Sequence, residues 1–233
     1  MPETLTFILV DPGLPENIGA ATRALKTMGL ERLRLVRPAE HLGARARWMA
    51  HGANDVLERA EVFESLEAAL ADVDFALATT ARDRHRAEGY VTPDRLPNFL
   101  VDKGDAARHA ALVFGSEQSG LPNRELALCD ALTTVPLAAS YPSLNLAQAV
   151  MVYAYALSPL QAIAESPVPS PETDSFRVLR QRVEAILGRL DVGTDNPLSH
   201  RLIQRLAQVP GADLKLLHFV LGKLEPHLNK KDS

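Results

Sequence analysis

The sequence predicts an α/β fold with a mostly parallel sheet and helices on both faces, followed by a small helical extension. Two observations support this prediction. Short apolar runs of strand length alternate with amphipathic helical runs through the first two thirds of the chain, which is the pattern of βα units. After a proline-rich stretch only helical periodicity remains. We therefore expect an α/β domain at 1–160, a proline-rich linker at 161–175 and a helical C-terminal extension at 176–233.

The first βα unit has clear boundaries. The apolar run Leu5–Val10 is a predicted strand that stops at Asp-Pro-Gly, and a helix is expected over Asn17–Leu30. Gly29 should end that helix, because glycine readily adopts the left-handed conformation found after helix C-termini. The apolar residues that recur there at helical spacing are Ile18, Ala21, Leu25 and Met28.

The rest of the predicted domain repeats this alternation. Further strands are expected at Arg34–Val36, Asp74–Thr80, Ala110–Phe114 and Leu132–Val135. Short helices are expected at Arg45–Gly52, Ser65–Leu70, Pro97–Val101 and Arg124–Asp130, with a polar turn at Gly115–Asn123. A longer apolar helix should run from Leu144 to Leu157, with Ser143 in the position of its cap. The extension then shows three helical stripes, which begin at Phe176, Leu202 and Leu214.

Composition excludes several classes of protein. At 233 residues, with 46% hydrophobic and 23% charged residues, the chain is typical of globular proteins that bury a core. Its single cysteine, Cys129, excludes an internal disulfide and a multi-cysteine metal cluster, and favours a reducing cytoplasm. The seven histidines lack metal-ligand spacing, so no metal is expected. No signal peptide and no membrane span are expected either, because no apolar run is long enough.

The charge distribution leaves two interpretations open. A net charge of −4 argues by itself against a nucleic-acid partner. Between Arg23 and Arg59, however, basic residues outnumber acidic ones by eight to four. This segment could form a basic face on an acidic protein, or it could consist of ordinary solvated arginines.

The absence of known sequence motifs argues against three classes of enzyme. Gly115 and Gly120 have the spacing of a phosphate-binding P-loop, but Leu121 follows where lysine is required. The first strand is not followed by Gly-x-Gly-x-x-Gly, which weakens a nicotinamide-type dinucleotide site. Gly-x-Ser-x-Gly is absent, so a hydrolase nucleophile elbow is not expected.

Small and polar residues gather at four predicted strand ends. In a parallel sheet these ends share one edge, which is where ligands bind. The four segments are Asp11–Gly19, Thr79–Arg82, Gly115–Gly120 and Pro136–Asn145. The last of them, a strand end, a loop and a helix start, could form a ligand cradle or be an ordinary β-loop-α crossover.

Three short motifs within these segments carry a family resemblance. They are Asn17-Ile-Gly-Ala-Ala-Thr-Arg23, Val113-Phe-Gly-Ser-Glu-Gln-Ser-Gly-Leu121, and Val135-Pro-Leu137 with Ser143-Leu-Asn145. Each is weak alone, but together and in this order they resemble the signature motifs of the SPOUT superfamily, specifically the TrmH-type RNA 2'-O-methyltransferases. The run Gly19–Leu30, Thr80-Ala-Arg82 and Asn196-Pro197 narrow the match to bacterial enzymes that methylate cytidine or uridine riboses in tRNA.

The resemblance implies a fold that periodicity cannot reveal. Members of this superfamily have a deep trefoil knot in the C-terminal part of the sheet, and S-adenosylmethionine sits bent within it. The residues implied to bind this cofactor are Thr79, Thr80, Ala81, Gly115, Val135, Pro136, Leu137, Ser143 and Leu144. The family also forms homodimers in which the active site is shared across the interface.

The resemblance further implies a catalytic set of Arg23, Asn17, Glu117 and Asn145. Arginine is protonated throughout the physiological pH range, so Arg23 could serve as an unusual base or could fix the phosphate and hydroxyl in line. Asn17 and Glu117 would orient Arg23 or shape the site, unless they are a helix cap and a surface carboxylate. Asn145 could instead bond backbone amides in the first helical turn.

The implied reaction is methylation of a ribose 2'-hydroxyl of tRNA, at anticodon-loop position 32. Three alternatives stay open: ribosomal RNA or another tRNA position as substrate, an inactive knotted RNA-binding module, and a generic nucleotide-binding protein. Ala138 and Ala139 stand where many family members carry glycine, so the methionine side of the pocket is expected to differ in detail.

Overall fold

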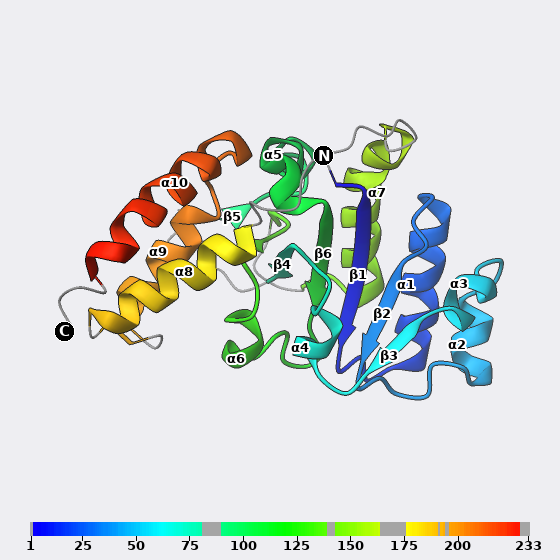
Figure 1. Ribbon diagram of the computed structural model, residues 1–233. Helices are drawn as coiled ribbons and strands as arrows, with labels where there is room; N and C mark the ends of the chain where they lie inside the picture. The colour runs from blue at the N-terminus through cyan, green and yellow to red at the C-terminus, as the bar shows by residue number, and fades with distance from the viewer. Residues whose placement is uncertain are drawn as a thin grey trace.

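A parallel sheet forms the centre of the computed structural model, which describes residues 2–80, 90–138, 143–163, 176–190, 192–193 and 196–228. Within these residues the strand order is β3-β2-β1-β6-β4-β7-β5, and each adjacent pair is parallel (Figure 1). The strands are β1 Thr4–Val10, β2 Leu33–Val36, β3 Glu61–Phe63, β4 Phe75–Thr79, β5 Tyr90–Val91, β6 His109–Phe114 and β7 Ala131–Thr133. All carboxyl ends therefore meet at one edge.

Helices cover both faces of the sheet, as the sequence predicted. They are α1 Pro15–Thr27, α2 Ala44–Met49, α3 Asn54–Glu58, α4 Leu66–Ala69, α5 Leu96–Lys103, the 3-10 helix η1 Gly104–Ala107, α6 Asn123–Leu126 and α7 Leu146–Ile163. Alternate strand residues point to opposite faces, so Phe7 of β1 packs in the core with α1 and α7. Its neighbour Ile8 packs in the core with α4 and α6.

The structure adds four elements that the sequence did not indicate. They are α3, the 3-10 helix η1 and the edge strands β3 and β5. β3 has three residues, none of them buried, and β5 has only two. Strands of two or three residues are too short to show the alternating or continuous apolar pattern on which strand prediction depends. The predicted strand at Leu132–Val135 is shifted, since β7 ends at Thr133, three residues before Pro136.

Three C-terminal helices pack against the sheet end that holds β4 and β5 (Figure 1). They are α8 Phe176–Arg189, α9 Pro197–Leu206 and α10 Gly211–Leu228. The ring of Phe176 lies 5.2 Å from that of Phe75 in β4, and Arg180 of α8 pairs with the buried Asp130 at 3.0 Å. The helices therefore share a core with the α/β part.

Two predictions stay untested. The helix α7 extends to Ile163, whereas residues 164–175 of the predicted linker lie outside the described residues. The trefoil knot also remains a prediction, because the segment expected to be threaded includes residues 139–142, which lie outside them as well. None of the described helices combines the length and apolar character that a membrane crossing requires.

Candidate functional site

A cavity of about 360 Å³ opens at the carboxyl edge of the sheet, where β4, β6 and β7 end and α7 begins. Its position agrees with the rule that parallel sheets bind ligands at this edge. The predicted site residues that line it are Thr79, Thr80, Gly115, Glu117, Val135, Leu137, Ser143 and Leu144. Pro136 is not among the lining residues, and Ala81 lies outside the described residues.

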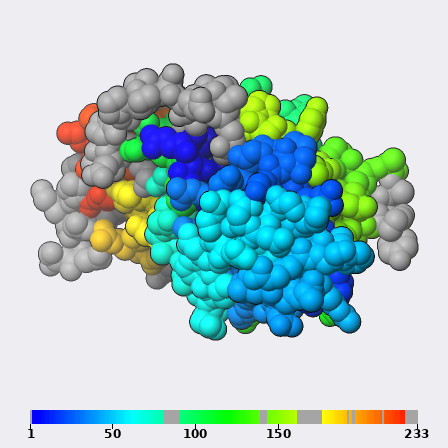
Figure 2. Space-filling model, turned by 90° about the vertical axis from the view of Figure 1, so that its right-hand side faces the viewer, coloured from blue at the N-terminus to red at the C-terminus, as the bar shows by residue number. Residues whose placement is uncertain are grey.

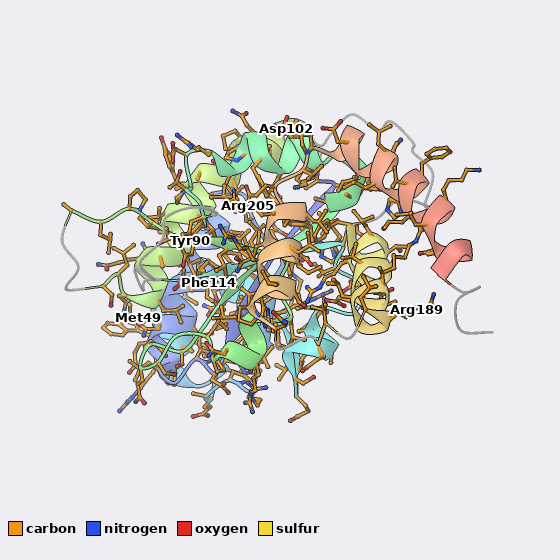
Figure 3. All side chains as sticks on the ribbon, turned by 90° about the vertical axis from the view of Figure 1, so that its left-hand side faces the viewer. Met49, Tyr90, Asp102, Phe114, Arg189 and Arg205 are labelled. Atoms are coloured by element: carbon orange, nitrogen blue, oxygen red, sulfur yellow. The ribbon has the colours of Figure 1, made fainter. Side chains whose placement is uncertain are left out.

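Two aromatic residues that sequence reasoning did not assign to the site also line the cavity. The rings of Phe114 and Tyr153 meet edge to face, 5.6 Å apart, and Phe114 lies in the interior of the molecule (Figure 3). The hydroxyls of Tyr153 and Thr133 are 3.1 Å apart, and burial raises the pKa of Tyr153 to about 12. The helical stripe indicated only that Tyr153 belongs to the core, since periodicity does not distinguish a core residue from a cavity wall.

Hydrogen bonds join the three sequence motifs beside this cavity. Asn17 Nδ2 donates to Glu117 Oε1 at 2.7 Å, and Asn145 Nδ2 donates to Asn17 Oδ1 at 3.0 Å. The other oxygen of Glu117 accepts from the backbone N–H of Gly13 at 3.0 Å. We call Gly13, Asn17, Glu117 and Asn145 the motif network. It brings together residues more than 100 positions apart in the chain.

The structure bears on the capping roles that the sequence left open for these residues. Asn17 is not a helix cap, because Leu14 occupies the N-cap position of α1. Asn145 does bond a backbone amide in the first helical turn, since its Oδ1 accepts from the N–H of Ala147 at 2.9 Å, whereas its catalytic role stays a prediction. This bond has N-cap geometry, so the expectation that Ser143 caps the helix is wrong.

Gly115 is required by the chain itself. A Cβ atom at this position would lie 2.1 Å from the backbone carbon of Gly120 and 2.2 Å from the nitrogen of Leu121. These distances leave no room for a side chain, so the loop after β6 closes tightly upon its own start. The close approach that glycine permits here is therefore made by the protein's own backbone.

Arg23 stands apart from the motif network. It is exposed on α1 and is not among the residues that line the cavity. Within the described part of the chain no side-chain hydrogen bond or ion pair of Arg23 is found, whereas Asn17 and Glu117 bond to each other. Within a single protomer, Asn17 and Glu117 therefore do not bond Arg23, and the prediction that they orient it or shape the site stays open.

The arginine-rich segment around Arg23 is largely neutralised. Six of its eight basic side chains form ion pairs with carboxylates: Lys26, Arg34, Arg37, Arg45, Arg47 and Arg59. Apart from the pair of the buried Arg34, these pairs are at least partly exposed, and exposed pairs contribute little stability while placing opposite charges side by side. In the described residues no group of three or more potential metal ligands occurs.

Family comparison matches nearly the whole chain. Residues 4–155 match the SpoU rRNA Methylase family, and residues 173–228 match the C-terminal domain of the tRNA/rRNA methyltransferase LasT. The chain is 46% identical to the uncharacterized tRNA/rRNA methyltransferase LasT of Escherichia coli, over 97% of this chain and 99% of that protein. It is 39% identical to the tRNA (cytidine/uridine/adenosine-2'-O-)-methyltransferase TrmJ of Pseudomonas aeruginosa, over 66% of this chain and 60% of that protein.

Solved structures show the same architecture. TrmJ from Z. mobilis superimposes with a TM-score of 0.64 at 30% identity, covering 97% of this chain and 99% of that one. The SpoU methyltransferase AviRb from Streptomyces viridochromogenes, in complex with AdoMet, gives a TM-score of 0.53 at 22% identity, over 70% of this chain and 62% of that one. The second likeness supports the fold alone.

Proposed function

This chain belongs to the SpoU methylase family, and we propose that it transfers a methyl group from S-adenosylmethionine to a ribose 2'-hydroxyl of tRNA. The observation that carries the proposal is the motif network, which unites the three family motifs beside a cavity at the carboxyl edge of the sheet. The proposed 2'-O specificity is supported by the TrmJ relatives, which are named as tRNA 2'-O-methyltransferases.

The cavity has the character that S-adenosylmethionine requires. Its volume of about 360 Å³ falls within the roughly 300–1,000 Å³ of small-molecule sites. Phe114 and Tyr153 offer apolar surface to a flat adenine, while the hydroxyls of Thr79 and Ser143 and the backbone after Gly115 offer polar groups to a ribose or a methionine. When bound, the cofactor supplies an activated methyl group.

The chain's own contribution would be alignment, because a sulfonium donor needs no further activation. Glu117 and Asn145 are held rigidly through Asn17 and would fix the reacting groups beside the cofactor. Arg23 would bind the phosphate next to the target ribose and orient its hydroxyl.

We further propose that the active site is shared across a homodimer. Arg23 is exposed and away from the cavity of its own protomer, so it would serve the cavity of a partner. The yellow-green surface of α7 borders the blue surface of α1 in Figure 2. At helical spacing along α7, Gln148 and Tyr155 are exposed and Val152 between them is half-buried, and these residues would form part of the interface.

The substrate would be cytidine or uridine at anticodon-loop position 32 of tRNA, and the protein would act in the cytoplasm. The names of the relatives also support a different RNA substrate. LasT is described as a tRNA/rRNA methyltransferase, and the family as rRNA methylases. Methylation of ribosomal RNA, or of another tRNA position, is therefore the second candidate.

Labelled methyl transfer tests the reaction and the residue roles together. The purified protein should label unmodified tRNA, and mapping should place the 2'-O-methyl group at position 32. Arg23→Ala should abolish labelling while the Kd for S-adenosylmethionine, measured by calorimetry, stays unchanged. Full turnover of Arg23→Ala would contradict its role. Labelling of ribosomal RNA alone would move the proposal to the second candidate, and tight RNA binding without any transfer would indicate an inactive module.

Subunit mixing tests the shared site directly. Arg23→Ala and Glu117→Gln should each be inactive alone. In a mixed population the heterodimer holds one intact composite site, formed by Arg23 of one protomer and Glu117 of the other. Random exchange should therefore restore roughly a quarter of the wild-type activity. If Arg23 served its own protomer, mixing would restore nothing.

A further inference from the structure

Asp11 and Arg37 occupy strained positions next to each other at the carboxyl edge of the sheet. They follow the neighbouring strands β1 and β2, whose last residues Val10 and Val36 are paired in register. Their φ angles are +49° and +47°, and they are the only non-glycine residues with positive φ in the described chain. Side chains disfavour this conformation, so the surrounding contacts must hold it in place.

The guanidinium of Arg37 supplies those contacts. Its Nε and Nη2 donate to the two carboxylate oxygens of Asp11, both at 2.8 Å, in the bidentate geometry that makes such pairs strong. Nη2 also donates to Glu125 Oε1 at 2.7 Å, and Nη1 donates to the carbonyl of Glu64 at 3.2 Å. One side chain thus ties together the segments that follow β1 and β3 and the helix α6.

Glu125 depends on this contact. Its side chain is only 5% exposed, and its second oxygen, Oε2, is buried with no hydrogen-bond partner in the described structure. A buried carboxylate is costly unless it is paired. Arg37 is the cation that pairs it.

Two of the three parts held by Arg37, the segment after β1 and the helix α6, lead to the site. Gly13, two residues after Asp11, donates its N–H to Glu117, and Pro12 between them accepts from the N–H of Ala39 at 3.0 Å. Leu126, which follows Glu125, lines the cavity. Arg37 itself does not line it.

We propose that Arg37 is a positioning residue for cofactor binding, acting through Asp11 on the motif network and through Glu125 on the cavity wall. This inference rests on the proposed function, because it assumes that the cavity takes S-adenosylmethionine. It identifies a residue outside the three motifs on which the geometry of the site depends.

The test compares Arg37→Gly/Glu125→Gln with Glu125→Gln alone. Glycine removes the guanidinium and also relieves the left-handed backbone, while glutamine removes the buried charge that would otherwise be left unpaired. Calorimetry measures the Kd for S-adenosylmethionine, and thermal unfolding checks the fold. Arg59→Ala is the control, because Arg59 pairs with carboxylates at an exposed site and contacts neither segment.

The proposal is supported if the Kd for S-adenosylmethionine is at least fivefold higher in the double variant than in Glu125→Gln. The Kd of the control variant should equal that of wild type. A smaller increase in the double variant overturns the proposal. If the double variant does not fold, Arg37→Lys is compared with wild type, and the same fivefold increase in Kd is required. Lysine keeps a cation but cannot form the bidentate pair. If the wild-type protein itself does not bind the cofactor, the proposed function fails instead.

Discussion

At the scale of single residues, the site depends on residues in tightly packed surroundings. Gly115 allows the loop after β6 to pass within contact of its own start, and the same loop carries Glu117 into the motif network. Asn145 caps α7 with one side-chain atom and bonds Asn17 with the other. In both cases one residue serves the fold and the site at once, because the site lies where three strands end.

Gly115→Ala tests this arrangement. The added methyl group would overlap the backbone of Gly120 and Leu121, so we expect a loss of about 1–3 kcal/mol in the free energy of unfolding and a weaker Kd for S-adenosylmethionine. Urea unfolding and calorimetry measure the two effects. Gly188→Ala is the matched control: a Cβ there meets nothing within 4 Å, and alanine in α8 should stabilise by up to about 1 kcal/mol. Unchanged stability and cofactor affinity in Gly115→Ala would contradict the crowding argument.

At the scale of elements, α7 is apolar on two sides. One side buries Val150, Tyr153 and Leu157 against the sheet. The other side exposes Tyr155, which is 71% accessible to solvent. Its neighbours on α7 are mostly apolar. A helix that is apolar all round is normally covered on all sides, which agrees with the proposed contact between two protomers.

Tyr155→Asp should therefore produce a monomer, because a charge at the centre of an apolar interface must be desolvated without a partner. Light scattering after size-exclusion chromatography measures the mass. Phe219→Asp is the control, since Phe219 is similarly exposed, at 66%, but lies on α10. A Tyr155→Asp protein that stays dimeric would show that α7 is not the interface. Loss of the dimer should also abolish activity if the site is shared.

At the scale of the whole molecule, Lys103 joins the sheet to the C-terminal helices. Its ammonium lies within 6 Å of the ring centres of Phe75, Phe99 and Phe176 and donates to the carbonyl of Val209 at 2.6 Å. Burial lowers the pKa of Lys103 from its ordinary 10.5 to about 8, although Asp130 and Asp102 act in the opposite direction.

This shift predicts a pH dependence of stability. Between pH 8 and 10.5 the unfolded chain holds the proton of Lys103 while the folded protein has released it, so the contribution of Lys103 to stability rises with pH by at most about 3 kcal/mol. The same contribution is lost progressively as the pH falls from 10.5 through 8. Burial raises the pKa of Cys129 and of Tyr153, and these groups act in the opposite sense at alkaline pH.

Urea unfolding of Lys103→Met isolates the effect, because the variant keeps the buried cysteine and tyrosine. The difference in unfolding free energy between wild type and variant should move in favour of wild type from pH 8 to pH 10.5. A difference that stays constant across this window would show that Lys103 does not titrate there.

The sequence by itself determined the α/β class, the order of the long elements and the identity of the three motifs, because these depend on local periodicity and on residue types at strand ends. It also placed Glu117, Asn17 and Asn145 in one site through the family resemblance. The short edge strands β3 and β5 could not be predicted from the sequence, because two or three residues are too few to show a periodic pattern.

Only the tertiary structure decided which groups meet. It showed that Asn17 bonds Glu117 and Asn145 instead of Arg23, that Gly115 accommodates the protein's own backbone, and that Arg37 pairs with both Asp11 and Glu125. Most of the basic residues counted between Arg23 and Arg59 proved to be paired with carboxylates. These contacts join residues far apart in the chain, so their geometry follows from how the strands are ordered in the sheet, which no local pattern specifies.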